Sequence, residues 1–243
     1  MPARPFARRP DHTPQAPRSL PRIVFFTALT AALSAACAPT HPHVHDAHHH
    51  AHRFDDAAHW AAVFDDPARD AWQQPDAVLR ALALAPDARV ADLGAGTGYF
   101  AVRLAAAVPQ GRVWALDVEP TLVRHMVARA AQQHLGNLFA VLCTPDDAML
   151  PEPVDAVLVV DTFHHLEDRP GYFRRLASSL RPGGRVVIVD FTRESPEGPP
   201  VAMRLAPDAV DAEMTTAGFV REGAVLPLPR QYVLVYRERP ATN

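Results

Sequence analysis

The chain has 243 residues, of which 48% are hydrophobic and 21% are charged, and its formal net charge is −3. This composition is typical of a globular protein with a sizeable core, and an acidic chain is a poor match for the phosphate backbone of nucleic acids. Its two cysteines, Cys37 and Cys143, are too few for a disulfide framework.

Residues 1–37 are expected to be a signal or anchor segment rather than part of the fold. They carry five arginines and one acid, and an apolar run, "IVFFTALTAALSAA", leads directly into Cys37. This run is short for a membrane span. The order resembles a bacterial lipoprotein signal, which implies a membrane tether through Cys37 or the apolar leader. An ordinary signal, an uncleaved anchor and a misassigned start codon are the alternatives.

Residues 38–53 are expected to form a histidine-rich linker. Seven histidines lie between His41 and His52, and imidazoles are good ligands for zinc, copper or nickel. A structural metal site, however, usually takes its ligands from folded elements. We therefore predict no metal site in this protein, and a functional metal site in the tract is the alternative.

Residues 54–243 are expected to form one α/β domain, with residues 54–85 as a helical cover at its N-terminus. Short β-branched runs alternate with helical patterns, which predicts parallel strands with helices on both faces. The predicted strands are 89–94, 111–118, 137–143, 154–161 and 185–191, and the predicted helices between and after them are 99–108, 120–136, 169–184 and 207–219. Residues 219–238 contain two strands joined by a proline-rich turn, and such a hairpin adds antiparallel strands.

The stretch "VADLGAGTGYF" (90–100) predicts a nucleotide-binding loop. It is not a phosphate-binding P-loop, because the chain contains no lysine. Nor does it match the dinucleotide fingerprint G-x-G-x-x-G, since Tyr99 stands where the third glycine would be. Asp92 lies beside the predicted helix N-terminus, where a second anion such as a pyrophosphate would be repelled. S-adenosylmethionine carries a sulfonium and an ammonium instead, and a carboxylate stabilises both.

Five motifs, in order and at the usual spacing, carry a family resemblance: "VADLGAGTG", "ALDVEP", "TPDDAMLP", "VLVVDTFHHLED" and "LRPGGRVVIVDF". Over residues 85–237 the chain resembles the class I S-adenosylmethionine-dependent methyltransferases. This resemblance implies an α/β, Rossmann-like sheet of seven strands in order 3-2-1-4-5-7-6, with strand 7 antiparallel and helices on both faces. It also implies S-adenosyl-L-methionine as the cofactor.

The resemblance assigns roles to residues at the carboxyl ends of the strands. Asp117 would bind the ribose hydroxyls, with Glu119 as a substitute, and Asp146 or Asp147 would meet the adenine. Asp161 and Thr162 would border the methyl-transfer cavity, and Trp72 could close over the donor. The cofactor-binding set is therefore Asp92, Gly94, Gly96, Gly98, Asp117, Asp146, Asp147 and Asp161.

Methyl transfer needs a base only where the acceptor must lose a proton, because most of the catalysis comes from alignment. His164 and His165 follow the fourth strand, and either is a candidate catalytic base. The alternative is that one of them caps the next helix or packs under the loop.

The sequence thus predicts a methyltransferase that acts on an unidentified small-molecule acceptor, with no nucleic-acid partner. The alternatives are an exported donor-binding or metal-binding lipoprotein without methyl transfer, and an NAD(P)-binding oxidoreductase. The leader predicts an exported or membrane-anchored protein, which conflicts with the cytoplasmic supply of the donor. A cytoplasmic location is the alternative.

Overall fold

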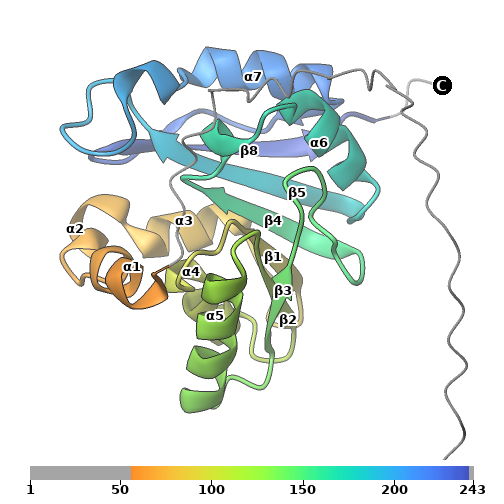
Figure 1. Cartoon of the computed structure of the whole chain (residues 1–243). Coiled ribbons are helices and arrows are strands. Elements are labelled where there is room, and N and C mark those ends of the chain that lie inside the picture. The colour runs from red at the N-terminus through yellow and green to blue at the C-terminus, as the bar shows by residue number, and fades with distance from the viewer. Residues whose placement is uncertain (1–55, 241–243) are drawn as a thin grey trace, which may run out of the picture. The chain divides into compact units, whose positions relative to one another are not determined.

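The computed structural model describes residues 56–240 (Figure 1). The predicted signal segment, Cys37 and the histidine-rich linker lie outside the described residues. No helix within the described range is long and apolar enough to cross a membrane.

The described residues form one mixed sheet flanked by helices on both faces. Its strands are β1 (Arg89–Leu93), β2 (Arg112–Asp117), β3 (Leu138–Leu142), β4 (Val154–Val160), β5 (Leu180–Phe191), β6 (Phe219–Arg221), β7 (Leu226–Pro227) and β8 (Gln231–Glu238). They lie in the order β3-β2-β1-β4-β5-β8-β6, and β7 pairs with β8. β8 runs antiparallel to β5. The predicted order is confirmed, because β8 takes the place of the seventh strand and β7 adds only two residues at its side.

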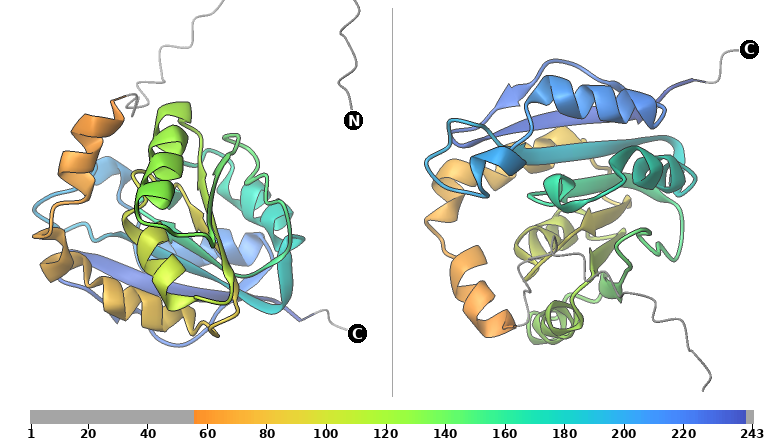
Figure 2. Two further views of the ribbon diagram at one scale, coloured as in Figure 1. Left: turned by 90° about the horizontal axis from the view of Figure 1, so that it is seen from below. Right: turned by 45° about the horizontal axis from the view of Figure 1, so that its top comes forward.

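Seven α-helices and two short 3₁₀ turns connect these strands in the described range. They are α1 (Ala57–Phe64), α2 (Arg69–Gln73), α3 (Pro75–Leu82), α4 (Tyr99–Ala107), α5 (Pro120–Gln132), η1 (Phe163–His165), α6 (Arg169–Ala177), η2 (Val201–Met203) and α7 (Pro207–Thr216). α3, α4 and α5 pack on one face of the sheet, and α6 and α7 pack on the other (Figures 1 and 2). We call residues 57–82, which contain α1 to α3, the N-terminal cover.

Two hydrophobic clusters, one on each face of the sheet, form the core. The central strand β4 is buried on both faces and has the sequence "VDAVLVV", as expected for a strand covered by helices on both sides. One cluster contains Leu104 and Met126 from α4 and α5. The other contains Phe173 and Met214 from α6 and α7. Helices on both faces thus hold the sheet rigid, and its carboxyl edge carries the loops of the site.

The helix predicted before β5 extended too far and included residues that belong to that strand. The helix predicted over 169–184 ends at Ala177, and Leu180 already pairs with Val154 in the sheet. The register then shifts, so that Ala156 pairs with Arg185. Gly183 lies at this register shift and has a φ of 78°, a conformation that favours glycine. The irregularity explains why Gly183 and Gly184 can lie within a strand.

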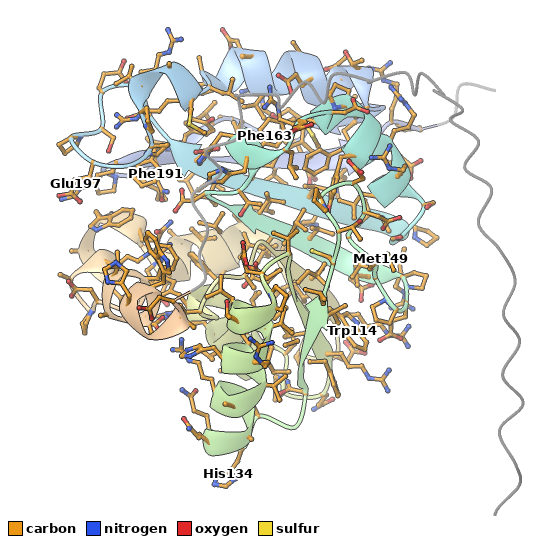
Figure 3. The ribbon with its side chains drawn as sticks, viewed as in Figure 1. Trp114, His134, Met149, Phe163, Phe191 and Glu197 are labelled. Atoms are coloured by element: carbon orange, nitrogen blue, oxygen red, sulfur yellow. The ribbon has the colours of Figure 1, made fainter. Side chains whose placement is uncertain are left out.

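The connection between β3 and β4 contains no helix in the structure. Trp114 and Phe139 therefore lie on a part of the sheet that no helix covers, with their ring centroids 5.1 Å apart. Figure 3 shows Trp114 on the side of the molecule away from the N-terminal cover.

Candidate functional site

The glycine loop connects β1 to α4 at the carboxyl edge of the sheet. Gly94, Gly96 and Gly98 have φ angles of 72°, 60° and 89°, in the left-handed region that favours glycine. A Cβ atom on Gly94 would lie 2.1 Å from Oγ1 of Thr162, the residue that follows Asp161 at the end of β4. The loop therefore lies directly against the end of β4, and a side chain at Gly94 would prevent this approach.

Asp117, at the end of β2, fastens the loop. Its Oδ2 accepts a hydrogen bond from the Gly96 amide at 2.8 Å, and its Oδ1 accepts one from the Glu119 amide at 2.9 Å. Burial raises the pKa of Asp117 above its usual value. Each carboxylate oxygen keeps a further lone pair, so that Asp117 can still accept hydrogen bonds from a pair of ligand hydroxyls.

Asp92 is the last residue but one of β1, and its side chain is inside the protein. The residue is 2% exposed, and its Oδ2 has no hydrogen-bond partner in the described part of the chain. Burial, with a smaller contribution from the charge of Asp117, raises the pKa of Asp92 to about 7. A buried carboxylate oxygen without a hydrogen-bond partner is costly, and a cationic ligand beside it would relieve that cost.

Asp161, after the end of β4, belongs to a closed network of four side chains that we call the Arg69 ring. Arg69 Nε donates to Gln73 Oε1 at 2.7 Å, Gln73 donates to Gln231, and Gln231 donates to Asp161 Oδ1. The ring closes where Arg69 Nη2 lies 3.5 Å from Asp161 Oδ2. Residues from α2, β8 and the end of β4 are thereby linked across the site.

Asp161 is held in an unusual state. Its φ is 53°, a left-handed conformation that a non-glycine residue rarely adopts. Burial raises the pKa of Asp161 to about 7 against the opposing charge of Arg69, although a quarter of its side chain, 24%, is exposed. Strained and perturbed carboxylates of this kind are typical of ligand sites.

His164 lies in η1, directly after β4, and is oriented by Asp190 near the end of β5. Its Nδ1 is 3.0 Å from both carboxylate oxygens of Asp190, and the two side chains are 2% and 0% exposed. In neutral imidazole this contact places the proton on Nδ1, so that Nε2 keeps its lone pair. Nε2 has no hydrogen bond within residues 56–240. The ring of His165 lies beside that of His164, with 4.2 Å between the centroids and the planes tilted by 42°.

The two candidates for the adenine contact, Asp146 and Asp147, lie together in the exposed turn after β3. Asp147 Oδ1 accepts the Met149 amide at 2.8 Å, which fixes the turn. The Asp146 carbonyl accepts two hydrogen bonds from Arg175, and its carboxylate makes no hydrogen bond to the described residues. The choice between the two aspartates stays open.

The N-terminal cover lies over the glycine loop. A Cβ on Gly96 would be 3.6 Å from the ring of Phe64, the last residue of α1. Asp65 accepts a hydrogen bond from Thr97 Oγ1 at 3.1 Å and one from Arg129 Nη1 at 2.8 Å. Asp70 also contacts Tyr99 and Arg103 of α4, and the ring centroid of Trp72 lies 5.8 Å from that of Phe191.

Figure 3 shows Phe191 at the end of β5 that faces the N-terminal cover, as the contact with Trp72 requires. Trp72 thus lies against the end of β5. Whether Trp72 covers a bound donor remains a prediction.

The chemistry of the site matches a cationic nucleoside rather than a phosphate. Asp92, Asp117 and Asp161 surround the glycine loop, and these carboxylates would repel a pyrophosphate. The unpartnered Oδ2 of Asp92 suits an ammonium or sulfonium, and Asp117 suits a pair of ribose hydroxyls. S-adenosylmethionine has all of these groups, so the residues present fit it. The fold and the site together are those expected of a class I S-adenosylmethionine-dependent methyltransferase.

Comparisons with known proteins agree with this class. Residues 90–184 match the family model described as "methyltransferase domain". An uncharacterized methyltransferase of Mycobacterium bovis is 34% identical over 121 residues, which cover 49% of this chain and 59% of that protein. The 27-O-demethylrifamycin SV methyltransferase of Amycolatopsis mediterranei is 34% identical over 107 residues, which cover 42% of this chain and 38% of the relative.

A crystal structure of a methyltransferase dependent on S-adenosylmethionine, from Aquifex aeolicus, superimposes with a TM-score of 0.68 at 24% identity. It covers 74% of this chain and 97% of that one. This likeness shows the fold. The chain spans less than two thirds of the length of the curated relatives it matches. The methyl donor that the family implies is S-adenosylmethionine.

The structure also brings in residues that sequence reasoning did not identify. Asp190 orients His164, and Arg69, Gln73 and Gln231 complete the ring around Asp161. Asp190 could have been found, because it is a charged residue inside the apolar run "VVIVDF". No local pattern pointed to Arg69, Gln73 or Gln231.

Proposed function

We propose that this protein transfers a methyl group from S-adenosylmethionine to a hydroxyl oxygen of a small-molecule acceptor. The observation that carries the proposal is the His164–Asp190 pair, which leaves Nε2 of His164 without a hydrogen bond next to the end of β4. Ligands of open α/β sheets bind at this edge. The Amycolatopsis relative is named as a 27-O-demethylrifamycin SV methyltransferase, and this name supports an oxygen acceptor.

The bound donor supplies an electrophilic methyl group on a positively charged sulfur. In our proposal Asp117 holds the ribose hydroxyls, and the carboxylates of Asp92 and Asp161 stabilise the positive charges. The backbone of Gly94 and Gly96 leaves room for close approach because neither residue has a side chain. The main effect of these residues is to hold donor and acceptor in line, which lowers the entropic part of the barrier.

His164 would act on the acceptor. Its Nε2 would take the proton of the acceptor hydroxyl as the oxygen forms its bond to the methyl carbon. The imidazolium that results would be stabilised by the Asp190 carboxylate at Nδ1. A hydroxyl is a weak nucleophile until it loses its proton, whereas a neutral amine can attack the methyl group without a base. The pair therefore favours an oxygen acceptor over a nitrogen acceptor.

The acceptor is expected to have a flat apolar part. Trp72 and Phe191 meet at the edge of the sheet, and the guanidinium carbon of Arg230 lies 5.2 Å from the Trp72 ring centroid. Phe191 is buried, but the half-buried indole of Trp72 can bind a flat apolar group by stacking. We therefore expect hydroxylated aromatic or polyketide-like compounds among the acceptors rather than small aliphatic alcohols.

The test is the release of S-adenosylhomocysteine from S-adenosylmethionine in the presence of three acceptor panels: phenols and other hydroxylated aromatics, amines, and thiols. We expect turnover with the hydroxylated panel, lost in His164→Gln, while the Kd of S-adenosylhomocysteine stays within about twofold of the wild-type value. Turnover with amines alone, or wild-type turnover in His164→Gln, would refute the role of His164 as base.

Export is a separate proposal and rests on the sequence of residues 1–37. A basic segment, a short apolar run and Cys37 favour a lipoprotein-like tether. Fusion of residues 1–45 to a reporter that is active only outside the cytoplasm tests it. Reporter activity supports export, and an inactive but stably produced fusion supports a cytoplasmic protein.

A further inference from the structure

Arg69 is a cation held among the carboxylates of the site. Its side chain is 13% exposed, and its guanidinium carbon lies 4.3 Å from the centroid of the Tyr99 ring. Burial lowers the pKa of Arg69 below its usual value. The negative charges of Asp161, Asp65 and Asp92 oppose this shift, because they stabilise the charged guanidinium. Arg69 belongs to the N-terminal cover, so that the cover contributes a charge to the site of the core domain.

Arg69 has hydrogen-bond capacity to spare. Of the five N–H donors of a guanidinium, Nε binds Gln73 and one Nη1 donor binds the Phe64 carbonyl at 2.9 Å. The distance of 3.5 Å between Nη2 and Asp161 is long for a charge-assisted hydrogen bond. The remaining donors therefore have only a loose ion pair among the described residues, although the guanidinium itself is held at Nε and Nη1.

Other arginines near the loop are committed to protein contacts. Arg129 Nη1 donates to Asp65 and to the Thr97 carbonyl, and Arg103 Nη2 donates to both oxygens of Asp70. Each of these pairs docks the N-terminal cover on the core. Arg69 alone among these three arginines pairs with a carboxylate, Asp161, that the donor is expected to approach.

The donor ends in an amino acid, with an ammonium and a carboxylate on the same carbon. Asp92 and Asp161 suit the ammonium, and a carboxylate beside them would need a cation of its own. We propose that Arg69 binds this carboxylate, so that the N-terminal cover selects donors with an intact amino-acid end. The inference rests on the proposed function, because it concerns the same donor.

A pair of ligands that differ only in the carboxylate tests this proposal. S-adenosylhomocysteine and its decarboxylated analogue are titrated calorimetrically into the full chain. We expect the wild-type protein to prefer S-adenosylhomocysteine by about 10- to 100-fold, the range for one charged hydrogen-bonded pair. In Arg69→Ala this preference is expected to fall to within about threefold. Arg69→Lys keeps the charge but not the planar fork, and it should retain part of the preference.

The control variant is Arg80→Ala, at an exposed position of α3 in the same cover, where the preference should equal the wild-type value. Thermal unfolding verifies that each variant is folded. Because the preference is a ratio within one variant, a general loosening of the cover lowers both affinities and leaves the ratio unchanged. A wild-type ratio in Arg69→Ala, or equal affinities in the wild-type protein, would overturn the role of Arg69. Failure of the wild-type protein to bind either ligand would refute the proposed function itself.

Discussion

His164 Nδ1 lies 3.0 Å from both carboxylate oxygens of Asp190, and both side chains are buried. The contact joins the end of β4 to the end of β5 and determines which imidazole nitrogen carries the proton. An Asp190→Asn variant can present its amide N–H to Nδ1, which favours the tautomer whose Nε2 is protonated. Turnover is expected to fall by about 10²–10⁴-fold, the range for loss of general base catalysis.

The donor affinity of Asp190→Asn should change by less than about threefold, because Asp190 does not line the glycine loop. Asp211→Asn is the matched control: Asp211 accepts a hydrogen bond from Tyr236, which pairs with Val186 away from the end of β5. It should leave turnover intact. The turnover of Asp190→Asn from pH 5 to 9 shows whether Asp190 positions His164 or only stabilises the fold. If the His164–Asp190 pair were merely structural, the shape of the pH profile would be the same as in the wild-type protein.

The buried carboxyl of Asp92 should make the ligand-free protein less stable as the pH rises. Its pKa is about 7 in the folded protein and close to 4 when unfolded, so the folded state binds its proton more tightly. The stabilisation of the folded state that comes from this proton is fully present below pH 4 and is lost as the pH rises through 7. Asp92→Asn should thus exceed the wild-type protein in stability at pH 8, by up to about 4 kcal/mol.

Urea unfolding at pH 5, 6.5 and 8 measures this difference. We expect it to be smallest at pH 5 and to grow towards pH 8. The same difference at all three values would show that Asp92 is not the titrating group.

Gly94→Ala should disrupt the loop. The new Cβ would lie 2.1 Å from Thr162 Oγ1, and alanine would have to adopt a φ of 72°. We expect a loss of about 1–3 kcal/mol in stability and no measurable binding of S-adenosylhomocysteine. Gly136→Ala is the control, because a Cβ there meets nothing within 4 Å. Wild-type affinity in Gly94→Ala would mean that the loop lies elsewhere.

Asp65 is expected to hold the N-terminal cover in place. Asp65→Ala removes the hydrogen bonds from Thr97 and Arg129, and it should lower the protection of the α1 amides against hydrogen exchange by about tenfold. Asp76→Ala, an exposed change in α3, should leave that protection unaltered. Unchanged exchange in Asp65→Ala would show that other contacts suffice to dock the cover.

The fold could be predicted from the sequence because its signals are local. The valine-rich run of β4 and the alternation of strands and helices required no knowledge of distant contacts. The end of α6 was misplaced because the pairing of Leu180 with Val154 is a tertiary contact that overrides the helical pattern. Asp92 and Asp117 were identified for the same local reason, since each lies at the carboxyl end of a strand.

The Arg69 ring could not be predicted in this way. Gln73 and Gln231 are 158 residues apart in the chain and meet only once β8 is inserted beside β5. Single glutamines carry no signal for such a contact. The residues that the N-terminal cover contributes to the site can therefore be identified only from the assembled fold.

The central claim is that the glycine loop binds S-adenosylmethionine rather than a dinucleotide. Calorimetric titration of the full chain with S-adenosylhomocysteine, and separately with NADH, tests it most directly. We expect saturable binding of S-adenosylhomocysteine with one site per chain, and no heat of binding for NADH. Binding of NADH, or no binding of S-adenosylhomocysteine by the folded protein, would contradict it.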